Sequence, residues 1–157
     1  MRLLVAGVGN IFNGDDGFGS EVAQRLQLAG VPEGVEVVDI GIRGVHLAYQ
    51  LLDGYDLLIL VDVVDRGEPP GTVVVLEPEL DAGAAPPMDA HRMDPAAVLG
   101  MLDDLGGSVE RLVVVGCQPA DLGEGIGLSP PVAAAVDVAA DAVRELVQEQ
   151  MVLIGEA

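Results

Sequence analysis

Reactive side chains are scarce in this chain, and that scarcity limits the chemistry it can perform. The 157 residues include no lysine, one cysteine, three serines, one threonine and two histidines, His46 and His91. None of the serines lies in the Gly-x-Ser-x-Gly motif of serine hydrolases. The lack of lysine excludes Schiff-base chemistry and a phosphate-loop lysine. We therefore expect an enzyme with this composition to rely on carboxylates, one histidine and a metal ion.

Carboxylates gather at the predicted ends of strands. Beyond the successive strands of the chain lie, in order, Asn10, Asp15 and Asp16; Asp39; Asp62 and Asp65; His91; and Cys117 with Gln118. In open α/β sheets, ligands bind outside the carboxyl ends of the strands, where the strand order reverses. The sequence therefore predicts an acidic site at one rim of a sheet.

The elements that must position these residues alternate along the chain. Short apolar runs predict strands, and three- and four-residue apolar spacing predicts helices. The strands are expected at 3–6, 35–38, 57–61, 72–76 and 112–115, and the helices at 17–29, 45–52, 94–105 and 129–147. Residues 78–93 are expected to form a loop. Only about ten residues separate the strands at 57–61 and 72–76, too few for a parallel return, so 72–76 is predicted to be antiparallel and at an edge.

These elements predict one domain over residues 1–157. The expected fold is an α/β three-layer sandwich, in which helices cover both faces of a five-stranded, mostly parallel, twisted sheet with one antiparallel edge strand. The strand at 57–61 is apolar on both faces and is expected to be central. Pro95 and Pro130 each follow a residue that can cap a helix, Asp94 and Ser129, so both mark helix starts.

Composition also excludes classes of partner. Seven arginines against 26 acids give 7 − 26 = −19, a charge that is repelled by nucleic acid and by anionic membranes. No segment is apolar for the ~18 residues of a membrane span, and the first apolar run is too short for a signal peptide, so a soluble cytoplasmic protein is expected. The lone Cys117 excludes intrachain disulfides and cysteine-rich metal sites, and is expected to be a small core residue.

The segment Gly7-x-Gly9 after the first strand suggests a dinucleotide-binding loop, but the pattern fails. The third glycine of the fingerprint falls on Phe12, and two acids, Asp15 and Asp16, stand where a pyrophosphate would bind. Adjacent acids at a helix N-terminus can also simply stabilise the helix dipole. Nucleotide binding is therefore disfavoured.

The same segment resembles the N-terminal signature of the hydrogenase maturation proteases. These endopeptidases trim the C-terminus of nickel–iron hydrogenase large subunits. The resemblance rests on Gly7-x-Gly9-Asn10, four further residues and Asp15-Asp16-Gly17-x-Gly19, and it continues through Val61-Asp62, His91, Val115-Gly116 and Ile126-Gly127-Leu128-Ser129-Pro130. It covers nearly the whole chain.

The resemblance implies a metal-reading site formed by Asp16, Asp62 and His91. Two carboxylates and one imidazole suit a divalent first-row cation. The family implies that this cation is nickel carried by the substrate, a large-subunit precursor, so that cleavage follows nickel insertion. Asp15 or Asp39 could serve as a general base or orient the water. A monomer is expected, and His46 is expected to be a helix-surface residue.

Two other functions remain open at this point. The first is a stand-alone metallohydrolase that holds its own divalent metal, such as zinc or manganese. The second is a non-catalytic metal-handling or interaction protein that uses the same acids. Metal analysis and a precursor cleavage assay would separate these alternatives from the maturation protease.

Overall fold

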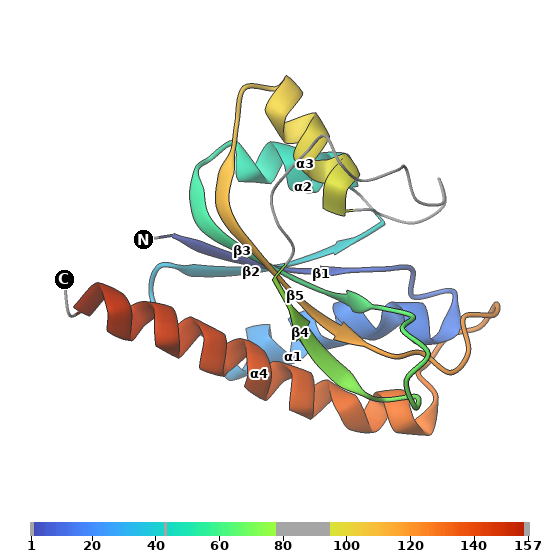
Figure 1. Ribbon diagram of the computed structural model, residues 1–157. Helices are drawn as coiled ribbons and strands as arrows, with labels where there is room; N and C mark the ends of the chain where they lie inside the picture. The colour runs from blue at the N-terminus through green and yellow to red at the C-terminus, as the bar shows by residue number, and fades with distance from the viewer. Residues whose placement is uncertain (1, 43, 78–94, 156–157) are drawn as a thin grey trace.

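A five-stranded sheet forms the middle layer of the molecule (Figure 1). The structure is a computed structural model that describes residues 2–42, 44–77 and 95–155. Its strands are β1 (Leu3–Val8), β2 (Val35–Gly41), β3 (Tyr55–Val63), β4 (Val73–Leu76) and β5 (Val109–Cys117). They lie in the order β2-β1-β3-β5-β4, and only the β4–β5 pair is antiparallel. The predicted sheet, with its antiparallel edge strand, is confirmed.

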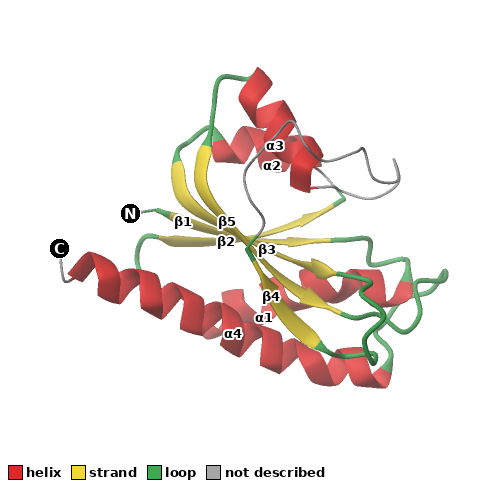
Figure 2. Cartoon of the chain, in the orientation of Figure 1, coloured by secondary structure: helices red, strands yellow, loops and turns green. Residues whose placement is uncertain are grey.

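Helices cover both faces of this sheet, which confirms the three layers (Figure 2). They are a 3-10 turn, η1 (Gly14–Gly17), followed by α1 (Phe18–Ala29), α2 (Gly44–Leu51), α3 (Pro95–Asp104) and α4 (Pro130–Gly155). In the figure, α1 and α4 lie on one face, and α2 and α3 on the other. In the described part of the chain, none of these helices combines the length and the apolar character needed to cross a membrane.

The side chains of β3 alternate between two hydrophobic cores. Ile59, Val61 and Val63 are buried in the core beneath α1 and α4. Leu58 and Leu60 are buried in the core on the α2 and α3 face. Because both faces of β3 are covered, the strand reads as a continuous apolar run, and its predicted central position is confirmed.

Several elements are longer than the sequence predicts. β5 begins at Val109 rather than Leu112, because Val109 pairs with Tyr55 of β3 although Glu110 and Arg111 interrupt the apolar run. Strand pairing thus extends past the point where hydrophobic patterning ends. The predicted loop at 78–93 and the predicted cap Asp94 lie outside the described residues.

The first turn of α1 packs unusually close to the sheet. A β-carbon on Gly19 would lie 2.3 Å from the carbonyl oxygen of Val61 and 2.4 Å from that of Val8. A β-carbon on Gly7 would lie 2.1 Å from the carbonyl oxygen of Gly19. Both glycines therefore allow helix–sheet contact, which explains a glycine-rich segment that does not have the dinucleotide-binding pattern.

Candidate active site at the carboxyl ends of the strands

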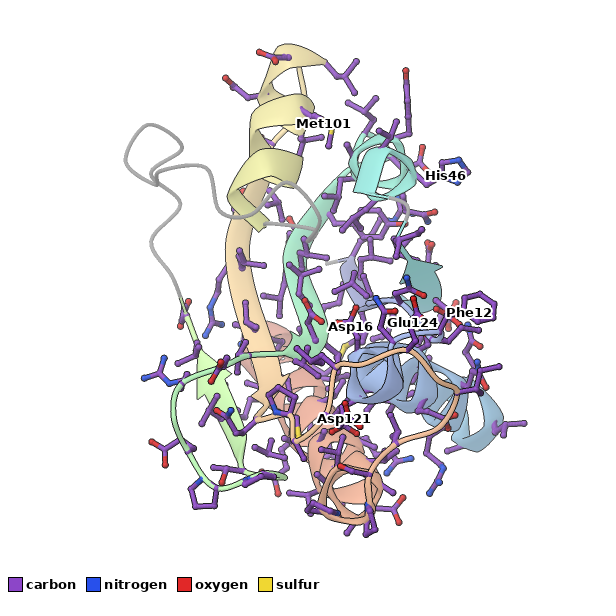
Figure 3. The ribbon with its side chains drawn as sticks, turned by 90° about the vertical axis from the view of Figure 1, so that its right-hand side faces the viewer. Phe12, Asp16, His46, Met101, Asp121 and Glu124 are labelled. Atoms are coloured by element: carbon purple, nitrogen blue, oxygen red, sulfur yellow. The ribbon has the colours of Figure 1, made fainter. Side chains whose placement is uncertain are left out.

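The strand order reverses between β1 and β3, which places a candidate site at their carboxyl ends. β2, the next strand along the chain after β1, lies on one side of β1, and β3 lies on the other side. Asp16 lies in η1 after β1, and Asp62 lies near the end of β3. Figure 3 looks onto this rim and shows Asp16 among the loops that form it. The predicted third ligand, His91, lies outside the described residues.

The loop after β1 wraps around Asp16. The half-buried Asp16 carboxylate accepts a hydrogen bond from the Asn10 backbone amide at 3.0 Å. The Asn10 side-chain oxygen in turn accepts one from the Phe12 amide at 2.9 Å. Gly9 has a φ of +134°, and a β-carbon there would lie 1.9 Å from the Asp16 carbonyl oxygen. Glycine at this position therefore lets the loop close around the carboxylate-bearing turn.

Asp62 extends from β3 toward the α2 and α3 face. Its neighbours Val61 and Val63 point into the core beneath α1 and α4, so the alternation of side chains along a strand directs Asp62 to the opposite face. The side chain is half-buried, and its Oδ1 accepts a hydrogen bond from the Val63 amide at 2.7 Å. The sheet thus fixes the direction of this carboxylate.

Asp15 is completely buried and acts as a clamp. Its carboxylate accepts hydrogen bonds from the backbone amides of Ala120 at 2.8 Å, Asp121 at 2.9 Å and Ser129 at 2.7 Å. A fourth comes from the Ser129 hydroxyl at 2.8 Å. Burial alone would raise the pKa of Asp15, but these hydrogen bonds together lower it below the ordinary value. This environment favours a structural role over the general-base role that the sequence left open.

The clamp joins the loop after β1 to residues 119–129, which connect β5 to α4. The backbone adds three further hydrogen bonds: Gly14 amide to Gly125 carbonyl at 2.9 Å, Asp15 amide to Asp121 carbonyl at 2.8 Å, and Gly125 amide to Phe12 carbonyl at 2.8 Å. The two loops therefore form one continuous wall beside Asp16.

Ser129 has a second role that its position in the sequence did not reveal. As the predicted cap implies, α4 follows it directly, and its carbonyl accepts a hydrogen bond from the Ala133 amide at 2.8 Å. Its hydroxyl and amide, however, both bind Asp15. The two residues are 114 positions apart, so no local pattern could have paired them.

Asp39 is exposed and lies on a different face of the sheet from Asp62. It sits on β2 opposite Gly7 of β1, and it accepts hydrogen bonds from the Ser20 hydroxyl at 2.7 Å and the Gln24 amide nitrogen at 3.4 Å. Both donors belong to α1. The structure therefore joins Asp39 to α1 rather than to Asp62, and a catalytic role for Asp39 stays a prediction.

Gln118 organises the loop that follows Asp62, a role that the sequence did not indicate. The Gln118 side-chain oxygen accepts hydrogen bonds from the amides of Arg66 at 2.7 Å and Glu68 at 3.3 Å. Its amide nitrogen donates to Asp65 at 3.0 Å. Gln118 is buried, and its side chain adds to the backbone hydrogen bonds that join the loop after β3 to the end of β5, among them Val64 amide to Cys117 carbonyl and Gly71 amide to Gln118 carbonyl.

Two residues with potentially reactive side chains lie outside this arrangement. Cys117 is completely buried in the core, where burial, together with the nearby charge of Asp15, raises the pKa of its thiol to about 11. The expectation that Cys117 is a core residue is confirmed. His46 is exposed on α2 and points outward, away from Asp16 (Figure 3), which confirms its surface position.

Two of the three ligands that the resemblance implies, Asp16 and Asp62, lie among the described residues at this rim. Asp16 and Asp62 offer carboxylate oxygens, which bind divalent cations. Over residues 2–42, 44–77 and 95–155, no group of three or more histidine, cysteine, aspartate or glutamate side chains is placed to hold a metal ion. The described residues thus contribute at most two of the three ligands that the resemblance implies.

Comparison with known proteins assigns the chain to a family. The family model described as hydrogenase maturation protease matches residues 20–146. The chain is 36% identical to the hydrogenase expression/formation protein HupD of Rhodobacter capsulatus over 92% of this chain and 71% of that protein. It is 32% identical to the hydrogenase 2 maturation protease of Escherichia coli over 95% and 92% of the two chains.

Solved structures agree with this assignment. The hydrogenase maturating endopeptidase HybD of Escherichia coli superposes with a TM-score of 0.83 at 31% identity, covering 96% of this chain and 94% of that one. The hydrogenase 2 maturation peptidase of a Thaumarchaeota archaeon gives 0.75 at 33% identity, covering 94% and 99%. The chain therefore belongs to the hydrogenase maturation protease family and is an endopeptidase of this class.

Proposed function

We propose that this endopeptidase removes the C-terminal extension of a nickel–iron hydrogenase large-subunit precursor after nickel has been inserted. Nickel is part of the substrate in this proposal, and Asp16, Asp62 and His91 bind it. The observation that carries the proposal is the position of Asp16 and Asp62 at the carboxyl ends of β1 and β3, on either side of the switch point where α/β folds bind ligands.

The surroundings of the two carboxylates support binding to a metal. Asp16 forms no ion pair with an arginine among the described residues. Hydrogen bonds from the backbone amides of Asn10 and Val63 orient the two side chains. Hydrogen bonds of this kind hold a metal-binding side chain in position before the metal arrives. Nickel would thus meet carboxylates whose directions the fold has already fixed.

Two nucleophilic side chains are unavailable for attack on a peptide, which supports metal-assisted hydrolysis. Cys117 is buried and protonated at neutral pH, and Ser129 is engaged in the Asp15 clamp. A metal ion can polarise the scissile carbonyl, so that water adds to the carbon, the C–N bond breaks, and the new amine takes up a proton. Asp39 could orient or deprotonate that water, and its hydrogen bonds from Ser20 and Gln24 would then hold it in place.

A reconstituted cleavage assay tests the proposal. Purified enzyme is mixed with nickel-loaded or nickel-free precursor, and mass spectrometry follows the loss of the C-terminal extension. We expect cleavage of the nickel-loaded form only, and losses of at least about 100-fold in kcat/KM for Asp16→Ala, Asp62→Ala and His91→Ala, because each removes a ligand of the proposed site. Asp104→Asn, an exposed carboxylate on α3, is the charge-matched control and should cleave normally.

Each failure of the assay points to a different alternative. Near-normal cleavage by both Asp16→Ala and Asp62→Ala would refute the site. Equal cleavage of nickel-free precursor would refute nickel recognition but not the peptidase. A stoichiometric ion that remains with the purified enzyme would indicate a metallohydrolase with a resident metal. Binding to the precursor without any change in its mass would indicate a non-catalytic interaction protein.

A further inference from the structure

Three apolar side chains are exposed on the wall beside Asp16. Ile11 is 45%, Phe12 61% and Ile126 78% exposed. The chain has only two phenylalanines, and the other one, Phe18, is completely buried. Single exposed apolar residues are common, but an aromatic and two isoleucines on adjoining loops form a patch of the kind that marks a binding surface. We call Ile11, Phe12 and Ile126 the docking ridge.

Backbone hydrogen bonds join the two segments of the docking ridge before any partner binds. The Gly125 amide donates to the Phe12 carbonyl at 2.8 Å, and the Gly14 amide donates to the Gly125 carbonyl at 2.9 Å. These bonds join the segment that carries Phe12 to the segment that carries Ile126. The buried Asp15 carboxylate joins the same two loops through its hydrogen bonds from Ala120 and Ser129. Little conformational entropy is therefore lost when the ridge binds a partner, which favours affinity.

The two segments that carry the docking ridge contain acidic residues and no basic ones. Exposed Asp121 and Glu124 lie on the same loop as Ile126, and Figure 3 shows Glu124 beside Phe12. Neither residues 9–17 nor residues 119–129 contain an arginine or a lysine, and the whole chain carries a formal charge of −19. A partner that complements this surface must present an apolar side chain close to basic ones.

The docking ridge is continuous with the proposed nickel-binding site. The Phe12 amide donates to the Asn10 side chain, and the Asn10 amide donates to the Asp16 carboxylate. Two hydrogen bonds thus link the backbone of Phe12 to the proposed ligand Asp16. A polypeptide that contacts Phe12 is therefore close enough for a neighbouring group of the same partner to reach Asp16.

From this geometry we infer that the docking ridge binds a segment of the substrate protein in which an apolar residue is flanked by arginine or lysine. This inference rests on the proposed function, because it takes the precursor as the partner. The ridge supplies affinity and register, while Asp16 and Asp62 act on the nickel centre. Phe12, Ile11 and Ile126 are then positioning residues for the substrate rather than catalytic residues.

Substitutions on the ridge test this inference with full-length enzyme and nickel-loaded precursor. Isothermal calorimetry gives Kd, and initial rates give KM and kcat. We expect Phe12→Ser and Ile126→Ser each to raise Kd by about tenfold, with a rise in KM that exceeds any fall in kcat, because truncating a central apolar anchor typically has this effect. Glu124→Gln should weaken binding at low salt and have less effect at high salt, where surface charges are screened.

Matched controls come from the opposite side of the molecule. Leu28 near the end of α1 is 88% exposed, more than any ridge residue, so Leu28→Ser removes a comparable apolar side chain away from the site. Glu110 is exposed at the start of β5, so Glu110→Gln controls for the loss of one charge. Both controls should keep the wild-type Kd, and circular dichroism should show that every variant is folded.

The outcomes separate this inference from the proposed function. If wild-type enzyme cleaves the precursor while Phe12→Ser and Ile126→Ser keep the wild-type Kd and KM, the docking ridge is wrong and the function stands. If wild-type enzyme binds but does not cleave, the function fails, and the same Kd comparison still decides the ridge. If Phe12→Ser changes only the sedimentation of the enzyme itself, the ridge joins two copies of this chain and the inference is wrong.

Discussion

Replacing Asp15 with asparagine should destabilise the protein although the two side chains have nearly the same shape. In the native structure one carboxylate oxygen accepts from Ala120, Asp121 and the Ser129 hydroxyl, and the other accepts from the Ser129 amide. Asparagine has only one acceptor oxygen. In its better orientation that oxygen keeps three hydrogen bonds, and the new NH₂ group faces the Ser129 amide, donor against donor.

The magnitude follows from these four contacts. Each hydrogen bond to a buried charged group contributes about 1.5–3 kcal/mol, and a donor left without a partner costs about 1–3 kcal/mol. Ala120 and Asp121 lie at the surface, where water can replace part of the lost hydrogen bonding, so the lower ends of both energy ranges apply. We expect Asp15→Asn to lower the free energy of unfolding by about 2–3 kcal/mol and Asp15→Ala by about 4 kcal/mol. Ser129→Ala, which removes only the hydroxyl, should cost about 1.5 kcal/mol.

The effect should also depend on pH, in a direction that the lowered pKa fixes. The pKa of an unfolded aspartate is about 3.9, and the pKa of native Asp15 is lower. The native carboxylate therefore stays ionised at pH values where the unfolded one is already protonated. Its stabilising contribution is complete above the unfolded pKa and is lost as pH falls through the native pKa. The stability difference between wild type and Asp15→Asn should shrink below about pH 4.

Urea denaturation followed by circular dichroism at pH 7 and at pH values down to 3 measures these differences. Asp104→Asn, which alters an exposed carboxylate on α3, is the control and should change stability by less than about 0.5 kcal/mol. If Asp15→Asn were as stable as wild type at pH 7, or if its deficit did not change with pH, the clamp would be refuted. If it folded with wild-type stability yet lost all cleavage, a general base would explain Asp15 better.

Three further predictions concern the frame of the site. Gly19→Ala should destabilise the protein by about 3 kcal/mol or more, because the new β-carbon would clash with two carbonyl oxygens. Gly100→Ala, which has open space around it on α3, should stabilise the protein by about 0.5–1 kcal/mol. Thermal denaturation measures both changes. Gln118→Ala should cost about 2 kcal/mol and reduce precursor cleavage, because the loop after Asp62 loses the side-chain hydrogen bonds at Arg66, Glu68 and Asp65. Cys117 should react with a thiol reagent only when urea unfolds the chain, since its pKa near 11 leaves little thiolate.

The overall fold could be predicted because its signals are local. The apolar run of β3 and the ten-residue gap before β4 were enough to predict a central strand and an antiparallel edge strand, and both are confirmed. Element ends were less accurate. Val109 pairs in the ladder although charged residues follow it, because backbone pairing with β3 continues where hydrophobic patterning stops. Val109 is itself buried, so a search for continuous apolar runs misses it only because Glu110 and Arg111 separate it from the run.

The site was predictable only in part, because its key contacts join distant residues. Strand ends predicted that Asp16 and Asp62 would share a rim, and the parallel β1–β3 pairing accounts for this. The partners of Asp15 and Gln118 could not be predicted. Ser129 lies 114 residues from Asp15, and Arg66 lies 52 residues from Gln118, so no periodic pattern links them. Such pairs depend on how loops meet once the sheet has formed.

The adjacent acids Asp15 and Asp16 show most clearly why sequence position alone could not assign roles. Both lie in η1, a 3-10 turn with about three residues per turn, so consecutive side chains diverge by about 120°. Asp15 therefore points inward to the loop at 119–129 and is fully buried, while Asp16 is half-buried at the rim. Because the same short turn carries the clamp and the proposed nickel ligand, any movement of Asp15 also moves Asp16. A loss of cleavage in Asp15 variants can therefore reflect displacement of Asp16, so their stability at pH 7 and its pH dependence, rather than their activity, distinguish a clamp from a base.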